Sequence, residues 1–287
     1  MRSAAARERR VGARAERMEG RAPKKRRGGR LLSAYAVFVY AFLYAPIAIL
    51  VLFSFNRARQ TAVWEGWTLE WYRNLAQNDL ILSAVKNSLI VGIGATAIAT
   101  VLGTLVALAL GRYAFPGEGF TRGLLYLPVI IPEIVLGAAL VTFFGVLAFR
   151  LSLTTVVIAH VVFCVSYVAI VVRARLAGFD RSLEEASLDL GARPLATFLR
   201  VTLPLITPGI VAGALLSFTI SIDDYVITSF VAGVGATTLP LQIYSMLKVG
   251  VTPEVNAVST LLLAVTVVLI VIAQKLQQAP IERGETS

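Results

Sequence analysis

Long apolar runs alternate with short polar segments along the whole chain. Each run reaches about the 20 residues that a helix needs to cross a bilayer. Pro128 and Pro132 interrupt the third run, and polar residues interrupt the fifth. The pattern predicts an all-α membrane protein with six transmembrane helices, at roughly 31–55, 87–110, 124–147, 153–172, 206–230 and 255–274.

The composition supports a membrane protein. The 287 residues are 57% hydrophobic and only 15% charged, whereas soluble domains usually carry about a quarter charged residues. The first apolar run is too long for the core of a signal peptide, so we interpret it as an uncleaved span. The single cysteine excludes an internal disulfide framework.

A basic tail precedes the first run. Residues 1–30 hold 12 of the 27 Lys and Arg residues and three acids, which leaves the rest of the chain close to neutral. Such a polar segment is expected to be disordered and to lie against the anionic inner leaflet. Nucleic-acid binding is not expected, because no nucleic-acid-binding fold accompanies the charge. The sequence leaves open whether translation starts at Met1 or Met18.

Lys and Arg in the loops predict the orientation of the spans. With the N-terminus inside, the inner segments carry 21 of these residues and the outer segments six. Because positive charge favours the cytoplasmic side, both termini are predicted to be cytoplasmic, including a short tail at 277–287. The spans are then expected to be surrounded by membrane lipid.

The first outer segment, about 56–86, contains every tryptophan of the chain. Trp64, Trp67 and Trp71 come within eight residues of one another. Two interpretations are open: an aromatic belt at the headgroups, or a docking surface for an external partner.

One amphipathic segment, 182–204, separates the fourth and fifth apolar runs. Ser182 and Glu185 have the spacing of a capping box, which predicts the start of a short helix. Gly191 is expected to end it in a left-handed conformation, and Pro194 fits the first turn of a second helix. Helices this short are unstable alone in water, so we favour docking to a partner over packing on the membrane surface.

The same segment resembles the "EAA---G---------I-LP" signature of ABC importer permeases. Ser187 replaces the second alanine and Val201 replaces the isoleucine. The stretches 55–75 and 217–263 are similar to permeases of the spermidine/putrescine importer group, above all to their second permease subunit. The matching residues of the signature are Glu185, Ala186, Gly191, Leu203 and Pro204.

This resemblance implies a type I ABC importer permease (MetI-like) domain over 31–276, located in a bacterial inner membrane. It implies that Glu185, Ala186, Ser187 and Gly191 contact a cytoplasmic ATPase, and that the complex has two ATPase subunits, a second homologous permease and an external solute-binding protein. The sequence carries no phosphate-binding loop motif. ATP and Mg are therefore expected on the partner ATPase, with no cofactor, metal or catalytic residue on this chain.

Acidic residues inside predicted spans are candidates for a substrate pathway, since intramembrane charges are costly and usually functional. Glu133 follows Pro132, where a helix tends to break. Asp223 and Asp224 are adjacent, so we expect one to face the pathway and the other to cap or pair. Tyr225 could add a cation–π face. Carboxylates suit a small organic cation such as a polyamine, but these acids could equally satisfy backbone amides at helix breaks.

Polar residues within the predicted spans allow two other hypotheses. His160 and Cys164 share a helix face, but metal sites of soft ligands usually need three or four protein ligands, so we expect His160 to pack with a hydrogen bond. A secondary transporter driven by an ion gradient could use Glu133 or the paired aspartates. That alternative gives no reason for the 182–204 segment.

Overall fold

The computed structural model describes residues 28–58 and 63–278, and most of these residues are helical. The predicted tails, 1–30 and 277–287, lie outside the described residues except at their inner ends. The chain divides into two units, residues 1–50 and 51–287. Helix α2, Gly28–Phe53, makes up the described part of the first unit, and its last turn enters the second.

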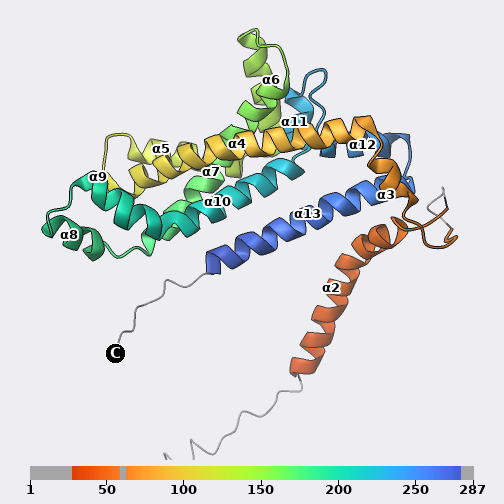
Figure 1. Cartoon of the computed structure of the whole chain (residues 1–287), viewed down its shortest axis with the longest axis horizontal. Helices are drawn as coiled ribbons and strands as arrows, with labels where there is room; N and C mark the ends of the chain where they lie inside the picture. The colour runs from red at the N-terminus through yellow and green to blue at the C-terminus, as the bar shows by residue number, and fades with distance from the viewer. Residues whose placement is uncertain (1–27, 59–62, 279–287) are drawn as a thin grey trace, which may run out of the picture. The chain divides into compact units, whose positions relative to one another are not determined.

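Long helices form the frame of the second unit (Figure 1). Helices α4, α7 and α10 pack against one another, and α13 packs on α10. Among the described helices, five are long and apolar enough to cross a membrane, or up to six if one bent pair is a single span. The predicted number of spans agrees with this upper count. The four frame helices are Asp79–Arg112 (α4), Leu153–Ala177 (α7), Leu203–Asp223 (α10) and Pro253–Gln278 (α13).

A glycine allows α4 and α7 to approach closely. A Cβ atom on Gly103 would lie 2.8 Å from the Cβ of Val168 and 2.9 Å from the carbonyl oxygen of Val165. Without a side chain at this position, the two helices bring their backbones together, as small residues allow in membrane bundles.

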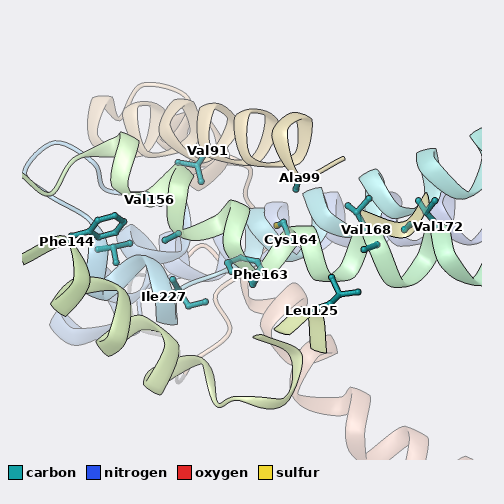
Figure 2. Close-up of a cluster of buried hydrophobic side chains, with 14 of the residues drawn as sticks. Val91, Ala99, Leu125, Phe144, Val156, Phe163, Cys164, Val168, Val172 and Ile227 are labelled. Atoms are coloured by element: carbon teal, nitrogen blue, oxygen red, sulfur yellow. The ribbon is translucent and has the colours of Figure 1, made fainter. Parts of the chain in front are cut away.

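Helix α7 runs through the centre of the core (Figure 2). Its apolar positions repeat on more than one side, because neighbouring helices cover it on several faces. The single cysteine, Cys164, is fully buried here. Five helices contribute the labelled side chains: Val91 and Ala99 from α4, Leu125 from α5 (Glu118–Ile130), Phe144 from α6 (Glu133–Val146), Ile227 from α11 (Val226–Val231), and Val156, Phe163, Val168 and Val172 from α7.

The third predicted span is broken, as its prolines predict. Helices α5 and α6 meet at an angle of 111°. Pro132 precedes the first residue of α6 and Ile131 is extended, so the break falls at these two residues. Pro128 stays inside α5. Beyond the break, α6 packs against α11.

The limits of the fifth predicted span, 206–230, are wrong at both ends. The helix already begins at Pro194 and runs to Asp223 over 30 residues, through α9 (Pro194–Thr197), a π-helical turn η1 (Phe198–Thr202) and α10. At its other end Asp224 is extended, and α11 starts anew. Polar residues interrupt the apolar run here, but apolar residues resume beyond them, so hydropathy alone does not show that the helix ends at Asp223.

The aromatic segment that contains the tryptophans folds around a short helix, α3 (Glu70–Leu75). The indole N–H of Trp71 donates to the carbonyl of Asn56 (2.7 Å), while the rings of Trp64 and Trp67 meet edge to face at 5.0 Å. Trp67 is 65% exposed, so both interpretations of the segment stay open. Helix α3 packs on α13, next to α12 (Leu239–Val249), in a second apolar cluster.

Candidate functional site

The amphipathic segment forms a short helix, an elbow and a second helix at one end of the bundle (Figure 1). Helix α8 spans Ser182–Asp189. Gly191 then takes a left-handed φ of +84°, and Pro194 opens α9. The predicted order of helix, glycine elbow and helix is therefore confirmed. Leu203 and Pro204 begin α10 within a continuous helix, so the second helix of the segment runs on into the following span.

The predicted capping box at Ser182 is also wrong. Ser182 is the first helical residue, and its backbone N–H donates to Oδ1 of Asp180 at 3.0 Å. The cap is thus supplied two residues earlier. The backbone and side-chain hydrogen bonds from Ser182 hold the pKa of the exposed Asp180 carboxyl below its usual value.

Helix α8 has an inward polar face. Arg181, just before the helix, donates to the carbonyl of Gly111 at 3.0 Å. Glu184 binds Arg112 and Thr202, and Ser187 shares a 3.0 Å hydrogen bond with Thr197. The spacing of three residues from Arg181 to Glu184 to Ser187 places them on one side. Sequence reasoning did not assign a role to Glu184.

The outward surface of the same segment is open. Glu185, Ala186 and Gly191 are exposed. Leu183 is 48% exposed and Leu190 is 89% exposed, so the apolar face predicted for this segment is uncovered in the chain alone. An uncovered apolar face beside charged residues is typical of a protein-interaction surface.

A cavity of about 320 Å³ lies at the break between α10 and α11. All four residues predicted for a substrate pathway, Glu133, Asp223, Asp224 and Tyr225, contribute to its lining. The breaks at Pro132 and Asp224 thus bring acids from distant parts of the chain together. Other lining residues include Leu136, Phe163, Tyr167 and Ile220.

The two adjacent aspartates differ in environment. Asp223 is exposed, whereas the side chain of Asp224 is only 5% exposed. The carboxylate of Asp224 accepts hydrogen bonds from the backbone of Ile227 (3.3 Å) and from the backbone and hydroxyl of Thr228 (both 2.8 Å). Asp224 therefore caps α11, and Asp223 is the more accessible acid of the cavity.

His160 completes the network around Asp224. Its Nδ1 lies 2.7 Å from the hydroxyl of Ser221, and its Nε2 lies 3.0 Å from the hydroxyl of Thr228. The residue is fully buried, so the predicted packing of His160 with a hydrogen bond is confirmed. Within residues 28–58 and 63–278, no three His, Cys, Asp or Glu side chains gather as they would around a metal ion.

Tyr225 stands beside the cavity in an aromatic pair. Its ring centroid lies 4.4 Å from that of Tyr244, and the ammonium of Lys248 lies 4.9 Å from the Tyr244 ring. The pair already engages a cation of the chain itself. A cation–π contact of Tyr225 with a substrate stays a prediction.

The helices are long and apolar enough to span a membrane, an exposed amphipathic segment lies at one end, and carboxylates line a cavity at a helix break. Together these features are typical of a membrane transport permease. The chain belongs to the family of binding-protein-dependent transport system inner membrane components, whose model matches residues 99–283. This match confirms the resemblance to ABC importer permeases that the signature in the sequence indicates.

Relatives of known name support the same assignment. The chain is 42% identical over 244 residues to the spermidine/putrescine transport system permease protein PotC of Haemophilus influenzae, covering 85% of this chain and 95% of the relative. It is 44% identical over 231 residues to the putrescine transport system permease protein PotI of Escherichia coli K12, covering 78% and 82%.

Solved structures agree on the fold. A bacterial ABC transporter involved in the import of alginate matches with a TM-score of 0.69 at 16% identity, covering 86% of this chain and 93% of that one. The MetNI methionine transporter, in inward-facing conformations, matches with a TM-score of 0.58 at 18% identity, covering 74% and 98%. The type I ABC importer permease fold predicted from the sequence is therefore confirmed.

Family membership defines the chain as a multi-pass permease subunit of the inner membrane and not an enzyme. It also implies an ATPase and a solute-binding protein as partners. The ion-gradient alternative is not favoured by these relationships.

Proposed function

We propose that this permease subunit carries a small organic cation, a polyamine such as putrescine or spermidine, into the cytoplasm by alternating access. The proposal is supported by the names of the relatives and by the acidic cavity. Both relatives described above are named for spermidine or putrescine transport. The observation that carries it here is the exposed carboxylate of Asp223 on a cavity that Glu133 also lines.

Carboxylates at this position suit an alkylammonium substrate. An ammonium group stripped of water needs hydrogen-bond acceptors, and an ionised carboxylate offers only acceptors. The apolar lining, including Leu136 and Phe163, suits the methylene chain between two ammonium groups. Asp223 and Glu133 would thus bind the charged ends, and Asp224 would keep the break in shape.

The exposed face of α8 is proposed as the contact with the ATPase. Glu185, Ala186, Ser187 and Gly191, followed by Leu203 and Pro204, correspond to the permease signature. The uncovered Leu183 and Leu190 support a docked state in which a partner covers them. ATP and Mg would then be bound by the ATPase, and this chain would need no cofactor.

The full assembly would contain two ATPase subunits, a second homologous permease and an external solute-binding protein. Both termini and α8 would lie on the cytoplasmic side, in agreement with the distribution of Lys and Arg along the sequence. Closure of the ATPases would push α8 and rock the helices between inward-open and outward-open states.

The test is uptake of labelled putrescine and spermidine into vesicles that carry the whole complex. We expect uptake to need ATP, to be lost in Gly191→Val and to be largely kept in Gly191→Asn. ATP-dependent uptake of another solute, with polyamines ignored, would replace the substrate. Uptake that follows an ion gradient without ATP would overturn the proposal.

A further inference from the structure

Three polar side chains from separate parts of the chain meet behind α8. The Oε1 atom of Glu184 accepts hydrogen bonds from Nη2 of Arg112 and from the hydroxyl of Thr202. The same guanidinium nitrogen lies 3.4 Å from the Thr202 hydroxyl, so the three groups form a closed triangle. We refer to Arg112, Glu184 and Thr202 as the triad.

The triad joins three helices at their ends. Arg112 is the last residue of α4, Glu184 lies in the first turn of α8, and Thr202 is the last residue of the π-helical turn before α10. Each charge also suits its own helix, because a cation is favoured at a C-terminus and an anion at an N-terminus. The backbone dipoles at these helix ends therefore stabilise both ionic groups.

The triad is sheltered from water. The side chains of Arg112 and Glu184 are 24% and 18% exposed, and Thr202 is fully buried. Sheltered, charge-assisted hydrogen bonds are stronger than exposed ones, and removing one partner leaves the others unpaired. The surface pair Glu118–Arg122, at 29% and 45% exposed, joins residues of a single helix and offers a comparison.

The contacts of α8 divide by face. Glu184 points toward the bundle, while its neighbour Glu185 is exposed. A push on the outer face would thus pass through Glu184 to the ends of two long helices. One of them, α10, runs 21 residues to Asp223, roughly 30 Å at 1.5 Å per residue, and so reaches the cavity.

We propose that Glu184 is a positioning residue that ties the partner-facing helix α8 to α4 and α10, and that the triad passes movement between the ATPase contact and the cavity. The inference rests on the proposed function. It separates two adjacent glutamates: Glu185 of the signature serves docking, and Glu184 serves transmission.

The experiment compares Glu184→Gln with Glu185→Gln and with the matched surface control Glu118→Gln. Each whole complex is placed in vesicles with its solute-binding protein. Three quantities are measured: ATPase subunits that co-purify, stimulation of ATP hydrolysis by the loaded binding protein, and solute taken up per ATP hydrolysed. Both the stimulation and the yield of transport need movement to pass between the cavity and the ATPase contact, so loss of transmission lowers both.

We expect Glu184→Gln to keep its ATPase subunits but to lower both coupling ratios about tenfold, within the usual range for coupled sites. Glu185→Gln should lose ATPase subunits, and Glu118→Gln should match wild type. Arg112→Glu alone should lower the coupling as Glu184→Gln does. The charge-swapped double variant Arg112→Glu, Glu184→Arg should regain part of the coupling, because the ion pair returns while both charges then oppose their helix ends.

Unchanged coupling in Glu184→Gln would overturn the proposal, as would loss of ATPase subunits in that variant. If Glu184→Gln fails to insert, Thr202→Val removes a single hydroxyl of the triad and is expected to show the same uncoupling. A wild-type complex that ignores polyamines would count against the proposed substrate alone, because stimulation of ATP hydrolysis still reports the triad.

Discussion

The imidazole Nε2 of His160 lies 3.3 Å from Oδ2 of Asp224, linking the central helix α7 to the break after α10. The same carboxylate caps α11 through Thr228. Asp224 is thereby committed to holding the break, while Asp223 next to it remains accessible. The two adjacent acids should respond differently to the same chemical change.

Asp223→Asn is expected to raise the KM for uptake of a cationic solute about tenfold with little effect on folding, because a hydrogen bond to a charged group contributes about 1.5–3 kcal/mol. Asp224→Asn should instead lower stability and leave the KM of the folded fraction nearly unchanged. Uptake kinetics and thermal unfolding of purified complexes separate the two effects. Identical behaviour of both variants would contradict the division of roles.

His160→Leu is expected to lower the free energy of unfolding by about 3 kcal/mol, since it removes the partner of buried polar groups. Ser221 and Thr228 each lose a hydrogen-bond partner in this variant, and Asp224 loses its contact with the ring nitrogen. His160→Gln keeps polar atoms at the site and should cost less. The measurement is the unfolding midpoint in detergent, and a His160→Leu protein as stable as wild type would be incompatible with this network.

Cys164 should be unreactive in the folded protein. Its side chain is fully buried, and it is the only cysteine of the chain. We expect a maleimide to label it at least a hundredfold more slowly in the native complex than after denaturation, because opening of the core is a rare event in a stable fold. Time courses of labelling test this, and rapid native labelling would show that the centre of the core is open.

Gly191 should tolerate asparagine far better than valine. Its φ of +84° is left-handed, and an added Cβ would meet no atom within 4 Å. The cost of a substitution is therefore that of holding a side-chain-bearing residue in a left-handed conformation, which is about 1–2 kcal/mol for most residues and less for asparagine. The measurement is how much ATPase co-purifies with each variant, and Gly191→Asn should retain more of it than Gly191→Val. Equal losses in both would mean that any side chain at this position blocks docking, whatever its backbone preference.

Gly103→Ala is expected to destabilise the bundle by about 1–3 kcal/mol, the usual cost of forcing extra atoms into a packed core. The new methyl group would meet both Val168 and the backbone of Val165. Gly123→Ala is the matched control, because a Cβ there has open space around it. Thermal unfolding should separate the two alanine variants, and similar midpoints would mean that α4 and α7 can move apart freely.

Much of the fold can be predicted from the sequence, because helices that cross a membrane must be long, apolar and hydrogen-bonded along their backbones. The run lengths predict the spans, Pro132 predicts the break before α6, and Gly191 predicts the elbow. These features depend on residues that are close in sequence. The acidic cavity was partly predictable too, since acids in apolar runs are unusual enough to single out Glu133 and Asp223.

Features that depend on contacts between distant residues were not predictable in this way. Hydropathy does not mark the break at Asp224, because apolar residues continue on both sides of it. Asp180, not the predicted Ser182, caps α8. Both side chains suit a helix cap, and the path of the chain before the helix decides which of them accepts the hydrogen bond. The partners of Glu184 come from α4 and the π-helical turn. The local pattern singles out Glu185 through the signature but gives no sign that Glu184 pairs with residues of other helices.

The π-helical turn Phe198–Thr202 also sets the angular phase between the two ends of one continuous helix. An α-helix advances about 100° per residue, and a π-helical turn commonly marks one residue inserted into that repeat. Deleting a single residue from it would rotate Asp223 by about 100° relative to the elbow at Gly191. The turn thus fixes the rotation of the helix, so that the carboxylate of Asp223 faces the cavity while the exposed face of α8 points away from the bundle.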